Sequence, residues 1–149
     1  RLADGADILM PNLTEASILI GTEYPGQDLT DPQVDEILRE LLDLGAKNVV
    51  LKGIDRNDGK LRNYVVNKRD GVDQKKELAH EKLPFMIHGT GDAFASALCG
   101  AVMAGRSLPQ AAYIAGEFVR NSMVSTRNQP HFEERGVSFE LNLKELTDL

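Results

Sequence analysis

The sequence is poor in the residues and segments that mark extracellular and membrane proteins. It has one cysteine and no tryptophan, and aromatic residues make up 5% of its 149 positions. The single Cys99 excludes an internal disulfide and suits a reducing compartment, so we expect a cytoplasmic protein. No apolar run approaches the roughly 18 residues that a membrane-spanning helix needs, and we therefore expect no membrane partner.

The charge balance and the first residue add two further expectations. The 17 basic and 23 acidic side chains give a net charge of −6. This argues against a sequence-independent nucleic-acid binder, which needs a basic surface, but a phosphate can still be held by a few amides and one cation. The chain begins at Arg1 without a methionine, so we expect residues 1–149 to be a single incomplete domain of a longer protein.

The first third of the sequence predicts strands and helices in alternation. A strand at 7–10 is followed by a helix at 12–20 that ends at Gly21. An amphipathic helix then begins at Thr30 or Asp31 and ends near Gly45. A buried strand follows at 48–53, and the order strand, helix, strand predicts parallel pairing of the two strands.

The rest of the sequence predicts an antiparallel edge and a helical end. Strands near 64–66 and 77–80 have the pattern of antiparallel strands with one wet face. Helices are predicted over 92–104, where Ala, Ser and Gly predominate, and over 109–126, with a short strand at 139–141. The predicted fold class is therefore α/β, a parallel sheet flanked by helices with an antiparallel edge.

A glycine-rich turn at the start of the 92–104 helix is the strongest local signal. Gly89, Thr90 and Gly91 allow consecutive backbone N–H groups to point to one place, and the first turn of the helix adds its own free amides. Asp92 lies at the edge of this anion hole and can accept a proton from an attacking hydroxyl, as phosphoryl transfer requires. An ordinary tight turn with Asp92 as a helix cap explains the spacing equally well.

Two further motifs stand at strand ends. Asn12 and Glu15, three residues apart, have the pattern of a capping box, which we favour over a ligand role on spacing alone. At the end of a parallel strand Glu15 could also hold a water or Mg²⁺ beside a phosphate. Lys52 and Gly53 follow the second strand, where a lysine can reach a nucleotide phosphate, although a solvated lysine is the more common case.

Other phosphate-binding loops do not fit. A Walker A loop needs Gly-x-x-x-x-Gly-Lys-Ser/Thr, and the sequence has none. The dinucleotide fingerprint needs Gly or Ala where Phe94 stands and should follow the first strand. The Gly-Thr-Gly-Asp turn therefore belongs to neither class.

Taken in order, the motifs resemble those of the ribokinase-like superfamily of ATP-dependent kinases. The matching features are Asn12-x-x-Glu15, the strand that ends at Lys52-Gly53, and Gly-Thr-Gly-Asp opening a small-residue helix. Within the superfamily, Pro-Asn-Leu-Thr-Glu-Ala at 11–16 resembles the vitamin kinases, pyridoxal (pyridoxamine) kinases and hydroxymethylpyrimidine kinases. The latter commonly carry Cys where this chain has Asp92, so the resemblance favours a pyridoxal kinase.

The resemblance implies roles for the matched residues. Asp92 would be the catalytic base toward the 5′-hydroxyl of the vitamin, and Gly89, Thr90 and Gly91 would form the anion hole. The remaining implied ATP-binding residues are Asn12, Glu15, Lys52 and Gly53, with Glu15 as the Mg²⁺ residue, acting through water, and the strands between Tyr64 and Phe85 bordering the adenine.

The resemblance also implies ligands and partners. ATP and Mg²⁺ are the expected cofactors, with a monovalent cation as a further candidate, and the partner is a small vitamin rather than a nucleic acid. The complete protein is expected to be a homodimer. The chain matches only the C-terminal half of the family's fold, so we expect this half to be inactive by itself. Two alternatives stay open, a hydroxymethylpyrimidine or sugar kinase and a non-catalytic nucleotide-binding module.

Overall fold

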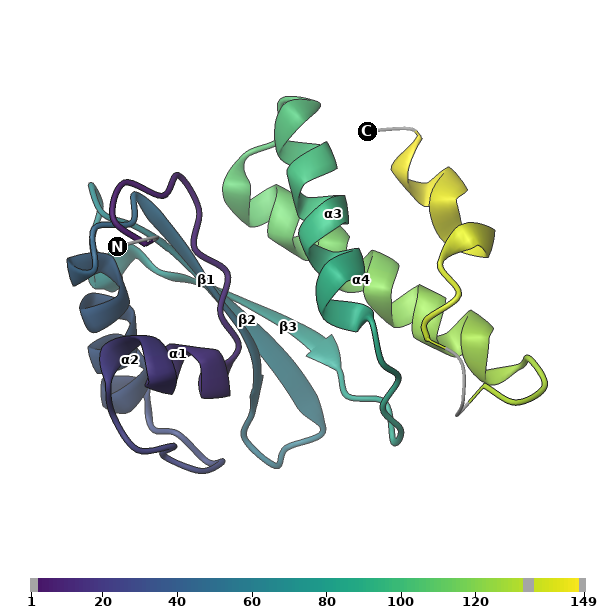
Figure 1. Cartoon of the computed structure of the whole chain (residues 1–149), viewed down its shortest axis with the longest axis horizontal. Coiled ribbons are helices and arrows are strands. Elements are labelled where there is room, and N and C mark those ends of the chain that lie inside the picture. The colour runs from purple at the N-terminus through teal and green to yellow at the C-terminus, as the bar shows by residue number, and fades with distance from the viewer. Residues whose placement is uncertain (1–2, 133–135, 148–149) are drawn as a thin grey trace. The chain divides into compact units, whose positions relative to one another are not determined.

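The computed structural model describes residues 3–132 and 136–147 (Figure 1). The chain forms two compact units, unit 1 over Arg1–Lys82 and unit 2 over Leu83–Leu149. Unit 1 contains α1 (Leu13–Ile20), α2 (Asp31–Asp43), β1 (Asn48–Asp55), β2 (Lys60–Asn67), the short 3₁₀ helix η1 (Val72–Gln74) and β3 (Lys76–Glu81). Unit 2 contains α3 (Thr90–Met103), α4 (Leu108–Arg127) and the 3₁₀ helix η2 (Glu140–Leu146).

Local sequence signals explain where α1 and α2 begin and end. Helix α1 has Asn12 as its N-cap and ends at Gly21, whose φ of 74° suits a glycine. Helix α2 has Thr30 as its N-cap and Gln33 as the reciprocal capping residue. The predicted positions of both helices are confirmed, because caps and helical periodicity depend on residues close together in the sequence.

The sheet of unit 1 has three antiparallel strands in the order β1-β2-β3. Val50 pairs with Val65, and Tyr64 pairs in turn with Glu77. The antiparallel strands predicted near 64–66 and 77–80 are therefore confirmed.

The predicted strand at 7–10 pairs with β1 in the expected parallel direction, but only through two isolated bridges. These join Leu9 to Val49 and Asn12 to Lys52. The bridging residues are three apart rather than two, and Pro11 between them has no N–H to donate to a ladder. The segment therefore accompanies β1 without forming a continuous strand.

The hydrophobic core of unit 1 lies between the sheet and the two helices, which lie on one face of it (Figure 1). The inward face of α2 is fully formed by the predicted apolar positions, Val34, Ile37, Leu38, Leu41 and Leu42. These side chains pack with Val49 and Leu51 of β1. Each buried side chain of this size contributes about 1.5–3 kcal/mol, so this face accounts for much of the stability of unit 1.

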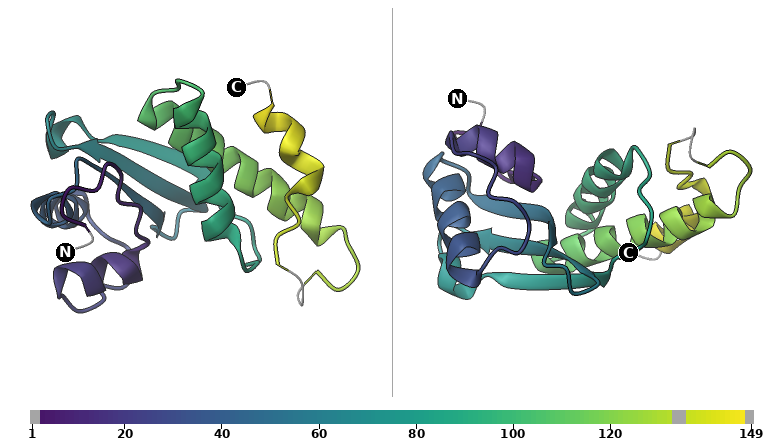
Figure 2. Two further views of the ribbon diagram at one scale, coloured as in Figure 1. Left: turned by 45° about the horizontal axis from the view of Figure 1, so that its top comes forward. Right: turned by 90° about the horizontal axis from the view of Figure 1, so that it is seen from below.

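Unit 2 is built on the pair α3 and α4, which Figure 2 shows from two further directions. Many of the buried positions of the two helices are small, which allows two helices to approach closely. The buried alanines are Ala93, Ala97 and Ala101 in α3 and Ala111, Ala112 and Ala115 in α4, and the large buried residues are Phe94, Leu98 and Phe118. Both helices lie within two residues of their predicted bounds.

The strand predicted at 139–141 is wrong. The segment after Phe139 is the 3₁₀ helix η2, with local bonds such as that from the Asn142 amide to the Phe139 carbonyl at 2.9 Å. The described part of unit 2 contains no strand with which the segment could pair. Local hydrogen bonds therefore satisfy its backbone instead.

Candidate active site

Asn12 and Glu15 form a reciprocal capping box at the start of α1. The Asn12 amide donates to Glu15 Oε2, and the Glu15 amide donates to Asn12 Oδ1, each at 2.8 Å. Both side chains are exposed. The favoured structural interpretation is thus confirmed, and the exposure leaves the same two side chains accessible to a ligand.

The parallel bridge brings Lys52 next to this box. The Lys52 amide donates to the carbonyl of Pro11 at 2.8 Å, so the end of the first segment and the middle of β1 are fixed against each other. Unit 1 therefore gathers three of the predicted ATP-binding residues, Asn12, Glu15 and Lys52, at one edge of the sheet.

Gly53, the fourth of these residues, lies at an irregularity of β1. The pairing register with β2 shifts between Leu51 and Ile54, and Gly53 has φ of 68°. Its amide donates to Asn63 Oδ1 at 3.0 Å. Asn63 was not singled out from the sequence, because a side chain that replaces a ladder bond across a bulge is visible only once the strands are paired.

The Gly-Thr-Gly-Asp turn opens α3 in unit 2. Gly89 is the N-cap, with φ of 84° and ψ of 0°, and no side chain among the described residues caps the helix. The alternative in which Asp92 serves as the cap is therefore wrong. Asp92 lies in the first turn and is exposed, and no described residue makes a hydrogen bond or ion pair with its carboxylate.

The backbone amides of this turn are available to a ligand. Within residues 3–132 and 136–147, no backbone carbonyl accepts from the amides of Gly89, Thr90, Gly91 or Asp92. The first amide of the helix with a backbone acceptor is that of Ala93, which donates to the Gly89 carbonyl at 3.1 Å. Such unsatisfied amides, at the positive end of the helix dipole, attract anions. Unit 2 therefore places four amides without a backbone acceptor and an exposed carboxylate at the start of α3, and the anion hole remains a prediction.

A charged network occupies the strands that were predicted to border an adenine. Arg62 donates to Asp58 and to Glu77, and Glu77 also accepts from the Tyr64 hydroxyl at 3.1 Å. The Arg62 guanidinium holds the pKa of Asp58 well below its usual range. Burial raises the pKa of Tyr64 to about 12, and the Glu77 carboxylate adds to the shift. These side chains satisfy one another, and the adenine border remains a prediction.

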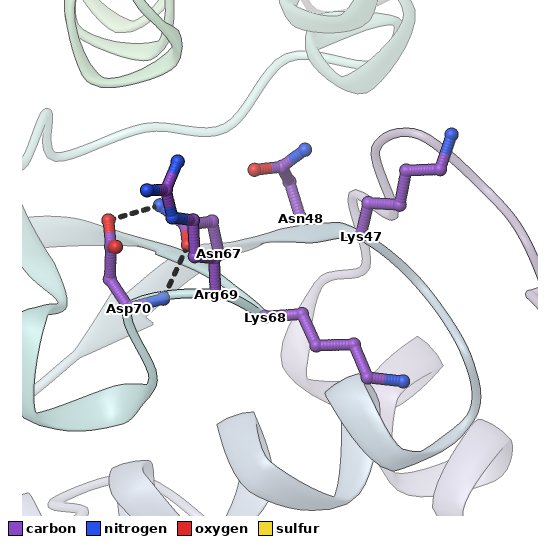
Figure 3. A pocket seen from close by; sticks show the side chains of 6 residues that line it. All are labelled: Lys47, Asn48, Asn67, Lys68, Arg69 and Asp70. Atoms are coloured by element: carbon purple, nitrogen blue, oxygen red, sulfur yellow. Dashed lines mark hydrogen bonds between the residues drawn. The ribbon is translucent and has the colours of Figure 1, made fainter.

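A cationic region lies at the start of β1, in an open cavity of about 560 Å³. Its lining residues are Lys47, Asn48, Asn67, Lys68, Arg69 and Asp70. Figure 3 shows that the two lysines and the arginine extend in different directions, and Lys47 is paired with Asp7 at 2.6 Å. The cations do not converge on a common point, so the cavity does not have the geometry of an anion site.

The described residues lack two features that mark other classes of protein. They contain no group of three or more His, Cys, Asp or Glu side chains that could hold a metal ion. No helix in the same part of the chain is long and apolar enough to cross a membrane.

The fold is that of a ribokinase-like α/β kinase, as the resemblance implies. The sequence profile of the phosphomethylpyrimidine kinase family matches residues 1–135. The chain belongs to this family, whose members are kinases.

Individual relatives agree with this assignment. The hydroxymethylpyrimidine/phosphomethylpyrimidine kinase of Saccharomyces cerevisiae is 32% identical over an alignment of 128 residues, and the match covers 83% of this chain and 23% of the yeast protein. A Bacteroides thetaiotaomicron protein assigned to the phosphomethylpyrimidine kinases has been solved with pyridoxal. It is 31% identical, with a TM-score of 0.81, and the match covers 96% of this chain and 49% of that one.

A third relative has been solved with an ATP analogue. The pyridoxal kinase of Staphylococcus aureus, in complex with AMP-PCP and pyridoxal, is 25% identical with a TM-score of 0.67. The match covers 81% of this chain and 43% of the staphylococcal chain. The chain thus spans less than half the length of each of these three relatives.

Proposed function

We propose that the natural protein carrying this chain is an ATP-dependent kinase that phosphorylates the 5′-hydroxyl of pyridoxal, pyridoxamine and pyridoxine. The observation that carries the proposal is the start of α3, where the amides from Gly89 to Asp92 have no backbone acceptor among the described residues and the Asp92 carboxylate is exposed. Because the chain belongs to a kinase family, the reaction proposed for this arrangement is phosphoryl transfer, which needs an anion hole and a base.

In the proposed reaction Asp92 accepts the proton of the vitamin's hydroxymethyl group. The oxygen of that group attacks the γ-phosphorus of ATP, and the bond from this phosphorus to the β–γ bridging oxygen breaks, so that ADP leaves. The amides of Gly89, Thr90 and Gly91 donate to the oxygens of the transferred group, where negative charge is concentrated. Because these donors are fixed backbone groups, they need little rearrangement when the charge develops.

The residues of unit 1 fit a hydrated magnesium ion. Glu15 is exposed, and only its Oε2 is engaged by the Asn12 amide. Mg²⁺ commonly keeps several waters and uses one or two carboxylates together with substrate phosphates. Glu15 would hold the ion through water, and Lys52 would lie along the nucleotide. When bound, the ion neutralises charge on the phosphates.

A hydroxymethylpyrimidine kinase is the second candidate. The family profile and the 32% identity with the yeast enzyme favour it. The Bacteroides relative solved with pyridoxal favours the first candidate, as does Asp92, which stands where the resemblance leads one to expect Cys in hydroxymethylpyrimidine kinases. Both acceptors carry a primary hydroxyl on a nitrogen heterocycle, so the proposed chemistry is the same.

A substrate panel on the natural protein tests the proposal. ADP release would be measured with ATP and each of pyridoxal, pyridoxine, hydroxymethylpyrimidine and ribose. The proposal expects the highest kcat/KM with a vitamin B6 form. A preference for hydroxymethylpyrimidine would select the second candidate, and one for ribose would indicate a sugar kinase. ATP binding without turnover of any acceptor would instead indicate a non-catalytic nucleotide-binding module.

A further inference from the structure

The loop before α3 is held in place by a short segment near the end of unit 2. We call residues 136–138 the strap. The Val137 amide donates to the carbonyl of His88 at 2.9 Å, and Val137 is itself buried. At Gly136 a Cβ atom would lie 3.4 Å from the same carbonyl oxygen. The strap therefore lies directly against the peptide group that joins His88 to Gly89.

This contact sets the direction of one anion-hole amide. The His88 carbonyl and the Gly89 N–H belong to the same planar peptide group, and in a trans peptide they point in opposite directions. The structure has no cis peptide among its described residues. By holding the His88 oxygen, the strap therefore fixes where the Gly89 N–H points. A contact from outside the loop matters here because glycine has the greatest backbone freedom of all residues.

The strap is in turn anchored to α4 by Thr126. The Ser138 amide donates to Thr126 Oγ1 at 2.9 Å, and Thr126 Oγ1 donates to the carbonyl of Ser122 at 2.6 Å. Thr126 is fully buried. A hydroxyl has a single proton, and the Ser122 carbonyl takes it, so the oxygen lone pairs remain for the strap amide. The Ser138 hydroxyl makes a second tie, donating to Gln129 Oε1 at 3.1 Å.

We infer that Thr126 is a positioning residue for the anion hole, acting through Ser138 and Val137 on the peptide that carries the Gly89 N–H. The inference rests on the proposed function of the Gly-Thr-Gly-Asp turn. Thr126 touches neither substrate nor reacting atoms in this arrangement. Its loss should therefore lower the rate of phosphoryl transfer and leave acceptor binding almost unchanged, because only the charge developing in the transition state loses a well-aimed donor.

The kinetic test replaces the threonine hydroxyl in the natural protein. Thr126→Val, which keeps the shape, should lower kcat about tenfold or more while KM for the acceptor stays within about twofold. Thr126→Ser should restore kcat, since it keeps the acceptor oxygen. Ser125→Ala is the matched control. It removes the neighbouring hydroxyl on α4, which bonds to Asn142 in η2 rather than to the strap. Its kcat should remain near that of the parent.

A second measurement separates this inference from the proposed function. Amide hydrogen exchange of Val137, followed by NMR without substrate, should be faster in Thr126→Val and unchanged in Ser125→Ala and Thr126→Ser. This readout tests the tie even if the parent protein transfers no phosphoryl group, a result that would overturn the proposed function. Unchanged Val137 exchange, or an unchanged kcat despite faster exchange, would overturn the positioning role. An equal loss of kcat in Thr126→Val and Ser125→Ala would also overturn it.

Discussion

At the scale of single residues, Asp92 carries the largest expected effect. Its carboxylate is exposed in the first turn of α3 and has no hydrogen-bond partner among the described residues. Replacing Asp92 by Ala should therefore remove the proposed base without disturbing the fold. We expect kcat to fall by roughly 10²–10⁴-fold, the usual contribution of general base catalysis, while ATP binding is retained.

This prediction is checked by ADP release and by calorimetric titration with ATP on the same preparation. Asp43→Ala is a suitable control, because Asp43 is also exposed and ends α2 in unit 1. Near-normal turnover in Asp92→Ala would eliminate Asp92 as the base.

Tyr64 gives a prediction for alkaline pH. Burial raises its pKa to about 12, above the ordinary value of 10.0. The folded state thus holds the phenol proton more tightly than the unfolded state, and the stability that this contributes is present below pH 10 and lost between about pH 10 and 12. Over that range the free energy of unfolding should fall more steeply in the parent protein than in Tyr64→Phe.

Ultraviolet absorbance of tyrosinate provides the direct measurement for Tyr64. The parent should show a late step near pH 12 that Tyr64→Phe lacks. If the variant lost absorbance from the early part of the titration instead, Tyr64 would not be the buried, high-pKa group.

At the scale of elements, the sequence predicts the features that are determined by residues close together in the chain, such as helix bounds and caps. Helix α2 could be placed from Thr30, Pro32 and its apolar periodicity, and the Asn12–Glu15 box from spacing alone. Features that depend on distant partners could not be predicted. The contact of Val137 with His88 joins residues 49 positions apart and leaves no local pattern. The strand predicted at 139–141 fails for the same reason, since a strand needs a pairing partner and the described part of unit 2 contains none.

The start of α3 allows a matched test of backbone geometry. Gly89 has φ of 84°, whereas Gly91 lies within the helix and has open space where a Cβ would stand. Gly89→Ala should cost about 1–2 kcal/mol of stability because an L-residue is strained in the left-handed region. Gly91→Ala should be neutral or stabilising by up to about 1 kcal/mol, since alanine favours the helix.

The free energy of unfolding of both glycine variants is measured by chemical denaturation, and their local stability by amide exchange in α3. The decisive quantity is the difference between them. Equal changes in the free energy of unfolding would contradict the left-handed conformation of Gly89.

At the scale of the whole molecule, an overall charge of −6 is compatible with handling phosphates. The proposed anion hole consists of backbone amides in unit 2, and the proposed metal residue is a single carboxylate in unit 1. Neither needs a basic surface, and the charges of the cationic cavity at the start of β1 do not converge on a common point. The protein is therefore expected to bind phosphates by local geometry, with little contribution from its net charge.

The last prediction concerns the 149-residue chain by itself. The matches with the two solved relatives cover 96% and 81% of this chain but only 49% and 43% of the relatives' chains, so more than half of each relative has no counterpart in these 149 residues. We expect the isolated chain to release no ADP in response to pyridoxal, whereas the natural protein does so. The amides of α2 and β1 should nevertheless be protected from hydrogen exchange, because the apolar side chains of these elements form a core within unit 1. Pyridoxal-dependent ADP release by the isolated chain, abolished by Asp92→Ala, would show that these 149 residues suffice for the reaction.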